Sequence, residues 1–323
     1  MSTLLVASAG GHLQELFELL PRLRGLDDDV TWVTFDTAQA RTLLAGEDVI
    51  YAHYARPRDG WMTLRNAAIA ASVLNGRRFS VVVSTGSTVA VSFLPVARLL
   101  GASCHYIESA TRISGPSLTG RIVRSVPGIH LYTQHQAWLR PPWVYRGSVF
   151  DGFIAGEDRR GRDPSRVVVS LGSIEGYGFR SLIERLVEIL PPATEVLWQT
   201  GSTDIRGLPI EARASVPGDE LAQAMTDADV VIAHAGVGSS LVALQAGQWP
   251  ILVPRRHARG EHVDDHQVQI ATELSELGLA MSREADQLKF GDLVVAASRS
   301  VARTEAAPAF ELVNDRRRRS PSG

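Results

Sequence analysis

The segment 229–247 restricts the possible fold most narrowly, because it joins an apolar strand, a glycine-rich turn and a helix start. The strand reads DVVIA, the turn contains Gly236 and Gly238, and the helix is predicted from Ser239 to about Ala246. The free N–H groups and the positive dipole end of such a helix form an anion site, most often for phosphate. Glycine lets the backbone approach a ligand closely. We therefore predict a phosphate-binding turn here.

Polar residues suited to sugar hydroxyls follow this turn in the run DDHQ at 264–267. A diphosphate on the turn, beside a polyol on Asp265, His266 and Gln267, would together be a nucleotide sugar. The run also begins a predicted helix, so N-capping by Asp264 or Asp265 is an alternative role for these acids. The pattern predicts a nucleotide-sugar site and leaves the capping role open.

Strand and helix patterns alternate along both halves of the chain. Strands are predicted at 3–8, 30–35, 49–53, 80–84, 103–107, 129–133, 166–171, 195–199, 213–216, 229–233 and 250–254. Helices are predicted at 12–24, 37–45, 61–75, 87–100, 119–125, 178–190, 219–226, 239–247 and 264–277. Continuous apolar strands between helix-length segments indicate parallel sheets covered on both faces. We predict an α/β fold of two doubly wound, Rossmann-like domains facing each other across a cleft, with ligands at the carboxyl ends of the strands.

The domain boundaries follow from a change in composition. The stretch AGEDRRGRDPS at 155–165 is rich in glycine and arginine, and it is predicted to be a linker. The first domain would then span 1–154 and the second 166–314, with a disordered tail at 315–323.

Cysteine content and hydropathy restrict the compartment and the class of protein. The chain has one cysteine, Cys104, which excludes an internal disulfide framework and suits a reducing compartment. The N-terminus enters a strand at once, so no signal peptide is expected. No window reaches 18 apolar residues, and the nearest candidate, 87–102, is interrupted by Pro95 and Arg98. No transmembrane helix is predicted.

Charge is unevenly distributed between the two halves. Residues 1–150 carry 14 Arg and 10 acids, whereas the remainder carries 19 basic residues and 25 acids. Residues 51–150 hold 11 Arg against only Asp59 and Glu108, with aromatic side chains such as Trp138 interleaved. Such a surface favours an anionic partner, and an anionic membrane face is expected rather than nucleic acid. A general preference of the chain for arginine over lysine would explain why the basic residues are arginines. It would not explain why acidic residues are so few in 51–150.

The first loop, SAGGHLQEL at 8–16, carries a candidate catalytic base. Its strand ends, Gly10 and Gly11 turn the chain, and His12 opens the first helix. The helix dipole disfavours a cationic histidine there, so His12 should be neutral and able to accept a proton. Glu15 fits the preference for acids in the first helical turn. The alternative is a plain glycine turn with His12 as a solvated cap.

The same loop is not a dinucleotide-binding fingerprint. The GxGxxG pattern is absent, and Asp36, the acid nearest the end of the second strand, belongs to a polar TFDT turn. NAD binding is not expected, and no cofactor is predicted.

Two weaker turns open the second half. In SLGSIEGYG at 170–178, Gly172 and Ser173 could contact a phosphate or the acceptor hydroxyl, and in QTGS at 199–202, Gly201 could border the base pocket. Each could equally be only a turn. His234 could be an ordinary strand-end histidine and Val237 a buried spacer.

The histidines near 257–266 do not predict a metal site. Their spacing, together with Glu261 and Asp265, matches no zinc signature.

The motifs together resemble family 28 glycosyltransferases. HAG-x-GS, then G-x-WP-ILVPR, then GEHVDDHQ are similar to the donor-binding half of that family, which includes the peptidoglycan-precursor N-acetylglucosaminyltransferase. ASAGGHLQEL, STGSTVAVSFLPVARLLGA and YIESATRISGPSLTGRI resemble the membrane-recruiting partner subunit of the two-component UDP-N-acetylglucosamine transferase. The chain looks like both subunits joined, as in bacterial exopolysaccharide pairs.

The resemblance implies a GT-B fold, an inverting transfer and a UDP-sugar donor held without an essential metal. It implies that His12 or Glu108 is the base, and that Gly10, Gly11 and Arg112 face the acceptor. The donor-binding residues expected from motif and resemblance are Gly172, Ser173, Gly201, His234, Gly236, Val237, Gly238, Ser239, Asp265, His266 and Gln267.

Two departures from the family pattern stand out. Many relatives place an acid that binds the ribose six residues after the glycine of HAG, where this chain has Val242. The eukaryotic partner subunit also has an N-terminal membrane helix that is not found here, so membrane contact would be peripheral, on the cytoplasmic side of the plasma membrane.

The sequence therefore predicts an inverting hexosyltransferase that moves a sugar from a UDP-sugar to a polyprenyl-diphosphate-linked saccharide, in surface polysaccharide biosynthesis. Two alternatives stay open: a nucleotide-sugar epimerase of the same architecture, and a non-catalytic subunit that binds UDP.

Overall fold

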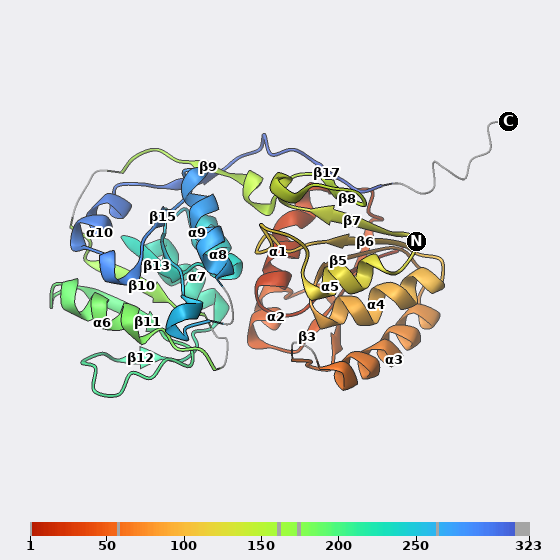
Figure 1. The fold of residues 1–323 in the computed structure, drawn as a ribbon, viewed down its shortest axis with the longest axis horizontal. Coiled ribbons are helices and arrows are strands. Elements are labelled where there is room, and N and C mark those ends of the chain that lie inside the picture. Colours follow the sequence, from red (N-terminus) through yellow and green to blue (C-terminus); the bar gives the residue numbers. More distant parts are fainter. Residues whose placement is uncertain (1, 57–58, 160–162, 173–175, 263–264, 314–323) are drawn as a thin grey trace. The chain divides into compact units, whose positions relative to one another are not determined.

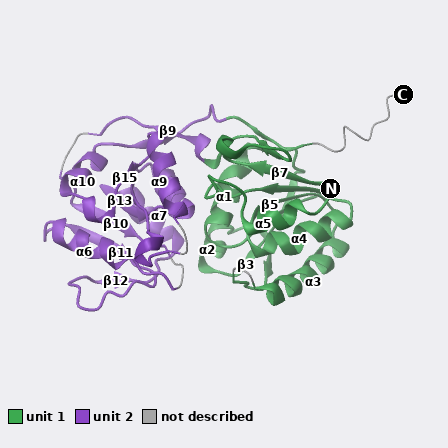
Figure 2. Cartoon of the chain, viewed as in Figure 1, with its two compact units in different colours: residues 1–149, 308–323 green, residues 150–307 purple. Residues whose placement is uncertain are grey.

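The structure of the protein is a computed structural model that describes residues 2–56, 59–159, 163–172, 176–262 and 265–313. The chain divides into two compact units (Figures 1 and 2). Unit 1 comprises residues 1–149 and 308–323, and unit 2 comprises residues 150–307. The tail predicted to be disordered, 315–323, lies outside the described residues.

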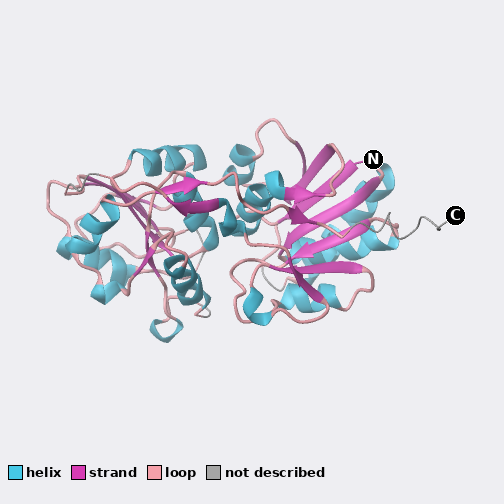
Figure 3. Cartoon of the chain, turned by 90° about the horizontal axis from the view of Figure 1, so that it is seen from above, coloured by secondary structure: helices cyan, strands magenta, loops and turns pink. Residues whose placement is uncertain are grey.

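Unit 1 is built on a seven-stranded parallel sheet in the order β4-β3-β1-β5-β6-β7-β8. Its strands are β1 (Ser2–Ala7), β3 (Asp29–Phe35), β4 (Asp48–Ala52), β5 (Phe79–Gly86), β6 (Ser103–Ile107), β7 (Ile129–Thr133) and β8 (Trp143–Tyr145). Its helices are α1 (Gly11–Leu19), α2 (Ala38–Leu43), α3 (Gly60–Gly76), α4 (Thr88–Leu99) and α5 (Leu118–Arg124), with short 3-10 turns at Leu20–Arg22 and Gln136–Trp138. Figure 3 shows helices on both faces of this sheet.

The core of unit 1 explains why its strands read as continuous apolar runs. Leu4 and Val6 of β1 pack with Phe93 and Leu94 of α4, while α1 contacts β1 and β5. Side chains on the other face of the sheet are buried too, because Leu5, between Leu4 and Val6, is fully buried. A strand covered on both faces needs apolar side chains at every position.

Unit 2 repeats this design with a six-stranded parallel sheet in the order β12-β11-β10-β13-β14-β15. Its strands are β10 (Arg166–Ser170), β11 (Glu195–Gln199), β12 (Ala212–Arg213), β13 (Val230–His234), β14 (Ile251–Val253) and β15 (Met281–Ser282). Its helices are α6 (Arg180–Ile189), α7 (Gly218–Asp227), α8 (Val237–Gln245), α9 (His266–Glu276) and α10 (Phe290–Ala297), with 3-10 turns at Val149–Gly152, His257–Arg259 and Ala285–Gln287.

Both sheets reverse their strand order at the first strand. In unit 1 the reversal lies between β1 and β5, where Ala7 pairs with Gly86. In unit 2 it lies between β10 and β13, where Ser170 pairs with Ala233. Open α/β sheets bind ligands outside the carboxyl ends of the strands at such a reversal. The topology therefore directs attention to one place in each unit.

Two segments near the unit boundaries make pairings that the sequence did not indicate. β9 (Phe153–Ala155) pairs antiparallel with β16 (Val301–Arg303) inside unit 2. β17 (Phe310–Glu311) pairs with β2 (Leu23–Arg24) of unit 1. These strands have only two or three residues, which is too short for a periodic sequence pattern. The expected domain boundaries at 154 and 314 therefore differ from the observed division at 149 and 307.

The predicted α/β fold with two parallel sheets is confirmed, and the predicted helices are present with shifted ends. α1 stops at Leu19 because Pro21 follows it, whereas the prediction ran to residue 24. α8 begins at Val237, two residues before the prediction. α10 was not predicted. Among the described residues, no helix combines the length and the apolar character that crossing a bilayer requires.

Candidate functional sites

The turn between β1 and α1 is fixed by a side chain from α2. Gly10 adopts φ 88°, a left-handed conformation that favours glycine, and helix α1 begins at Gly11. The Gly10 amide donates to Gln39 Oε1 over 2.6 Å, and Gln39 Nε2 donates back to the Gly10 carbonyl over 3.2 Å. The predicted glycine turn therefore has a defined shape that positions the residue after it.

His12 follows this turn and is held in one tautomer. Its Nδ1 lies 2.9 Å from the Thr85 carbonyl oxygen, and a carbonyl can only accept, so Nδ1 carries the proton and Nε2 does not. Thr85 Oγ1 donates to the His12 carbonyl over 2.7 Å. Burial, together with the charge of Arg112, lowers the pKa of His12 to about 4, although the bond to Thr85 acts in the opposite direction. The neutral state expected from the helix dipole thus has burial as its main cause.

The turn at the end of β5 lies beside both the His12 ring and the Tyr106 hydroxyl. Gly86 has φ 121°, and Ser87 has φ 70°, which is uncommon for a residue with a side chain. A Cβ atom at Gly86 would lie 3.3 Å from His12 Cε1 and 3.3 Å from Tyr106 Oη. The glycine is therefore needed so that the His12 ring and the Tyr106 hydroxyl can converge at the strand-order reversal of unit 1.

Glu108, the other candidate base, is occupied by neighbouring donors. Tyr106 Oη donates to its Oε1 over 3.0 Å, and the backbone N and Oγ of Ser117 donate to Oε2 over 3.0 and 3.1 Å. The side chain is 1% exposed, and burial raises its pKa. Ser117 is the N-cap of α5. Glu108 thus anchors the start of α5, and His12 is the better placed of the two bases.

Glu15 corrects an expectation from the sequence. Instead of serving the first turn of α1, its carboxyl is buried and accepts from Ser109 Oγ over 2.6 Å, and from Ala110 N and Gln134 Nε2 over 3.2 Å each. Burial raises the pKa of Glu15 to about 7. Sequence reasoning missed this role because its partners lie far along the chain.

Arg112 completes the acceptor-side residues of unit 1. Its positive charge acts on His12, Tyr106 and Glu108, since it lowers the pKa of each of them. Its carbonyl accepts from Trp138 Nε1 over 2.6 Å, which fixes the backbone there. The charge of Arg112 therefore reaches His12, Tyr106 and Glu108.

In unit 2 the glycine turn for which an anion was predicted forms the start of α8. Gly236 is the N-cap and Val237 is the first helical residue. The first N–H groups of an α-helix have no partner within it, so the amides of Val237, Gly238 and Ser239 are available to an anion. Val237 is 2% exposed, so its side chain belongs to the packing of unit 2.

His234 fills the space behind this turn. It is 6% exposed, and its Nδ1 lies 3.3 Å from the Ser170 carbonyl oxygen and 3.4 Å from Ser239 Oγ. A Cβ atom at Gly172, which has φ 73°, would lie 2.6 Å from His234 Cε1, and one at Gly236 would overlap Nε2. Burial lowers the pKa of His234 to about 3. Both glycines are therefore required by the neutral imidazole.

The other predicted donor-side residues make bonds within the protein. Gly201 N donates to the Ala214 carbonyl over 3.1 Å, so its amide is already used. Gln267 is buried, and its Oε1 accepts from Arg255 N over 3.0 Å. Ser173 lies outside the described residues.

The residues at the start of α9 also make hydrogen bonds within the protein. Asp265 occupies the N-cap position of α9 without a side-chain capping bond, and its Oδ1 accepts from His257 N over 3.0 Å. His266 Nδ1 lies 3.3 Å from Gln269 Oε1. Asp264 lies outside the described residues. Within the part of the chain that the structure describes, no three metal-binding side chains gather closely enough to hold an ion.

Arg255 is a site residue that sequence reasoning missed. It is 1% exposed, and its Nη2 donates to the Leu171 carbonyl over 2.8 Å, beside the Gly172 turn. Its guanidinium lies 5.7 Å from the centre of the Phe179 ring. Because arginine is usually exposed, the pair Arg255 and Arg256 gave no signal of a buried charge.

Comparison with known proteins agrees with this layout. Residues 166–302 match the glycosyltransferase family 28 C-terminal domain. The chain is 33% identical over 134 residues to UDP-N-acetylglucosamine–N-acetylmuramyl-(pentapeptide) pyrophosphoryl-undecaprenol N-acetylglucosamine transferase of Cupriavidus metallidurans, covering 39% of this chain and 36% of that protein. It is 40% identical over 73 residues to UDP-N-acetylglucosamine transferase subunit ALG13 of Yarrowia lipolytica, covering 22% and 35%.

The chain thus matches about a third of the length of these curated relatives. Among solved structures, MurG of Acinetobacter baumannii is similar with a TM-score of 0.55 and 18% identity, covering 91% of this chain and 89% of that one. A likeness at this identity concerns the fold. Residues 166–302 thus resemble a glycosyltransferase family 28 C-terminal domain, and the chain has the GT-B fold.

Proposed function

We propose that this protein is an inverting glycosyltransferase that moves a hexose from a UDP-sugar to a polyprenyl-diphosphate-linked saccharide, in surface polysaccharide biosynthesis. Unit 2 would bind the donor and unit 1 the acceptor, so that one chain combines a catalytic and a membrane-recruiting subunit. The match of residues 166–302 supports the donor half of this proposal.

The observation that carries the proposal is the start of α8. Three amides, at Val237, Gly238 and Ser239, are available at a strand-order reversal. A helix start at this place suits a diphosphate, because the dipole and the N–H groups act on the same anion. It would stabilise the negative charge that develops on UDP as the bond to the sugar breaks.

On the acceptor side, His12 Nε2 would take the proton from the acceptor hydroxyl. The hydroxyl oxygen would form its bond to the anomeric carbon while the bond from that carbon to the diphosphate oxygen breaks, with its electron pair leaving on UDP. The bond from Nδ1 to the Thr85 carbonyl leaves Nε2 as the basic atom. Arg112 and the start of α4 would meet the acceptor diphosphate.

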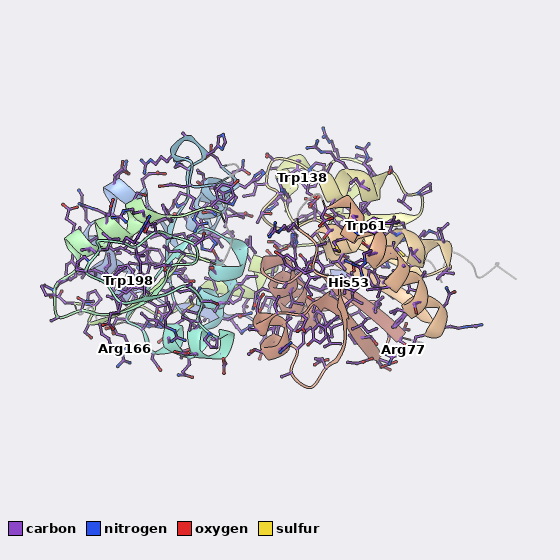
Figure 4. The ribbon with its side chains drawn as sticks, turned by 90° about the horizontal axis from the view of Figure 1, so that it is seen from below. His53, Trp61, Arg77, Trp138, Arg166 and Trp198 are labelled. Carbon is purple, nitrogen blue, oxygen red and sulfur yellow. The ribbon has the colours of Figure 1, made fainter. Side chains whose placement is uncertain are left out.

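Membrane contact would be peripheral, through α3 and the arginine-rich surface of unit 1. Trp61 and Leu64 on α3 are 67% and 63% exposed, and Tyr54 before this helix is 64% exposed (Trp61 is labelled in Figure 4). Met62, on the same helix, packs on the core. Exposed aromatic side chains among arginines suit an anionic bilayer surface. Replacing Trp61 and Leu64 by Ser should weaken sedimentation with anionic vesicles without changing UDP binding.

One observation keeps the binding-only alternative in view. Val242 stands where relatives place the ribose-binding acid, and it packs against the apolar cluster of Val168, Met225 and Val231. An apolar side chain there cannot accept the hydrogen bonds of the ribose hydroxyls. A protein that binds UDP weakly and does not turn over would have this feature.

A transfer assay separates these functions. The purified protein would be incubated with labelled UDP-sugars, starting with UDP-N-acetylglucosamine, and with a membrane lipid extract. We expect label in the lipid fraction and release of UDP. Formation of an epimeric UDP-sugar without lipid would support the epimerase alternative, and UDP binding without label transfer would support the binding-only subunit.

A variant pair locates the donor site. Ser239→Trp should abolish UDP binding and transfer, because the indole would fill the space in front of the α8 amides. Ser298→Trp is the matched control, since Ser298 ends α10. Full UDP binding by Ser239→Trp would show that the donor lies elsewhere.

A further inference from the structure

Arg255 is a buried cation behind the anion turn of unit 2. It follows β14, which is the sheet neighbour of β13, and its side chain is 1% exposed. Its Nη2 donates to the Leu171 carbonyl over 2.8 Å. The guanidinium is thereby fixed beneath the turn that leads to Gly172.

Most of the hydrogen-bonding capacity of this guanidinium is unused. Among the described residues, its Nε and Nη1 have no hydrogen-bond partner. The carboxylate that acts on it, Glu261, accepts instead from Ser181 Oγ over 2.6 Å and from Arg256 N over 3.0 Å. Removing a charge from water without full pairing costs several kcal/mol, so such a group calls for a compensating role.

The next residue, Arg256, differs from Arg255 in how its charge is paired. Arg256 is partly exposed and forms a two-pronged ion pair with Glu284, with Nε–Oε2 at 3.1 Å and Nη2–Oε1 at 2.5 Å. Its charge is therefore balanced within the protein. Within the described part of the chain, the charge of Arg255 has no such direct ion pair and is available to act on an anion nearby.

The residues around Arg255 connect it to the start of α8. The charge of Arg255 acts on the buried ring of His234, which helps to keep that ring neutral. The same ring is enclosed by Gly172 and by Gly236, the N-cap of α8. The cation and the start of α8 therefore both lie near one imidazole.

We propose that Arg255 is a positioning residue that supplies the fixed positive charge of the donor-diphosphate site, and so makes unit 2 select a nucleoside diphosphate over an uncharged nucleoside. Being buried, it acts through its field and through the Leu171 carbonyl rather than by touching the ligand. Buried charges are screened less by solvent and salt than exposed ones, so the field persists at the turn. This inference rests on the proposed donor site of unit 2.

The test is a calorimetric titration of the full chain with UDP, uridine and inorganic pyrophosphate. Arg255→Gln removes the charge but retains an N–H donor for the Leu171 carbonyl, whereas Arg255→Lys retains the charge. We expect Arg255→Gln to weaken UDP and pyrophosphate about tenfold or more and to change uridine less than twofold. Arg255→Lys should recover most of the affinity for UDP.

Arg256→Met is the matched control, because it removes an adjacent charge that Glu284 already balances. It should change the affinity for UDP less than threefold. Thermal melts check that each variant is folded. If Arg255→Gln is not folded, the affinities of Arg255→Lys and of the wild type for UDP and uridine decide the role of the charge.

Two results would overturn the inference. Equal weakening of UDP and uridine by Arg255→Gln would mean that Arg255 only supports the fold, and unchanged affinity for both would mean that its charge has no role. The donor proposal is tested separately. If the wild-type protein binds UDP no more tightly than pyrophosphate, the uridine part adds no affinity, and UDP as the donor is contradicted. The pyrophosphate titrations of the variants still decide the role of Arg255.

Discussion

The strand-order reversals of the two units both carry a histidine, and the two histidines differ in exposure. His12 and His234 each direct Nδ1 at a backbone carbonyl oxygen, and burial lowers the pKa of both. His12 is partly exposed, whereas His234 is 6% exposed and enclosed by two glycines. A histidine near the strand-order reversal is therefore partly open in unit 1 and enclosed by packing in unit 2.

The charged groups buried in the two units also differ. Unit 1 buries the carboxyl groups of Glu15 and Glu108, whereas unit 2 buries the guanidinium of Arg255 as well as the carboxyl group of Glu261. A cation behind the α8 start would attract an anion, which fits a donor diphosphate. In unit 1 the charge that acts on His12 is that of Arg112, which lowers the pKa of this imidazole.

The largest effect should come from His12. His12→Ala and His12→Asn should lower kcat about 10²-fold to 10⁴-fold, because the basic nitrogen is lost, and leave UDP affinity unchanged. Asn retains an N–H for the Thr85 carbonyl, so it separates loss of the base from loss of the bond. With the pKa of His12 near 4, wild-type kcat should fall on the acid side only as pH approaches that value. Full activity of His12→Asn would transfer the base role to another group.

The buried carboxyl of Glu15 should make unit 1 sensitive to pH. Its pKa is raised from 4.5 to about 7, so its contribution to stability is present below pH 4.5 and is lost as pH rises through 7. Glu15→Gln keeps the shape and removes the titration, so it should stabilise the protein above pH 8 by at most about 3 kcal/mol and give little advantage near pH 5. Denaturant unfolding at both pH values measures this.

The exposed Glu47→Gln is the control for that experiment and should shift stability equally little at both pH values. A Glu15→Gln variant whose advantage does not depend on pH would show that the carboxyl is not titrating in the native state.

The smallest effect concerns the packing of His234 in unit 2. Gly236→Ala should weaken UDP binding about tenfold and destabilise the fold by roughly 1–3 kcal/mol, because its Cβ would overlap His234 Nε2. The added substitution His234→Ala removes the overlap, so the double variant should recover part of the loss. Gly291→Ala, where a Cβ meets nothing within 4 Å, is the control. No recovery in the double variant would imply that the helix start itself needs glycine.

The elements that sequence predicted well are those with a strong local pattern. The apolar strands of both sheets and the glycine turn before α8 carry their information in adjacent residues, which is why the two parallel sheets could be predicted. The start of α8 was placed two residues late, because glycine at 238 argued against a helix that tertiary packing stabilises.

The features that sequence did not reveal depend on distant partners. Glu15 bonds to groups 94 to 119 residues away, and Arg255 meets Leu171 across 84 residues. Neither has a local pattern that distinguishes a buried charge from a surface one. The roles of Gly172 and Gly236 were also only half visible, since the need to accommodate His234 appears once the strands are side by side.

The most direct test of the account is a crystal structure of the protein soaked with UDP. We predict that the diphosphate oxygens lie about 2.7–3.2 Å from the backbone nitrogens of Val237, Gly238 and Ser239, at normal hydrogen-bond distance. A nucleotide found in unit 1, or at a place in unit 2 away from the start of α8, would contradict the account.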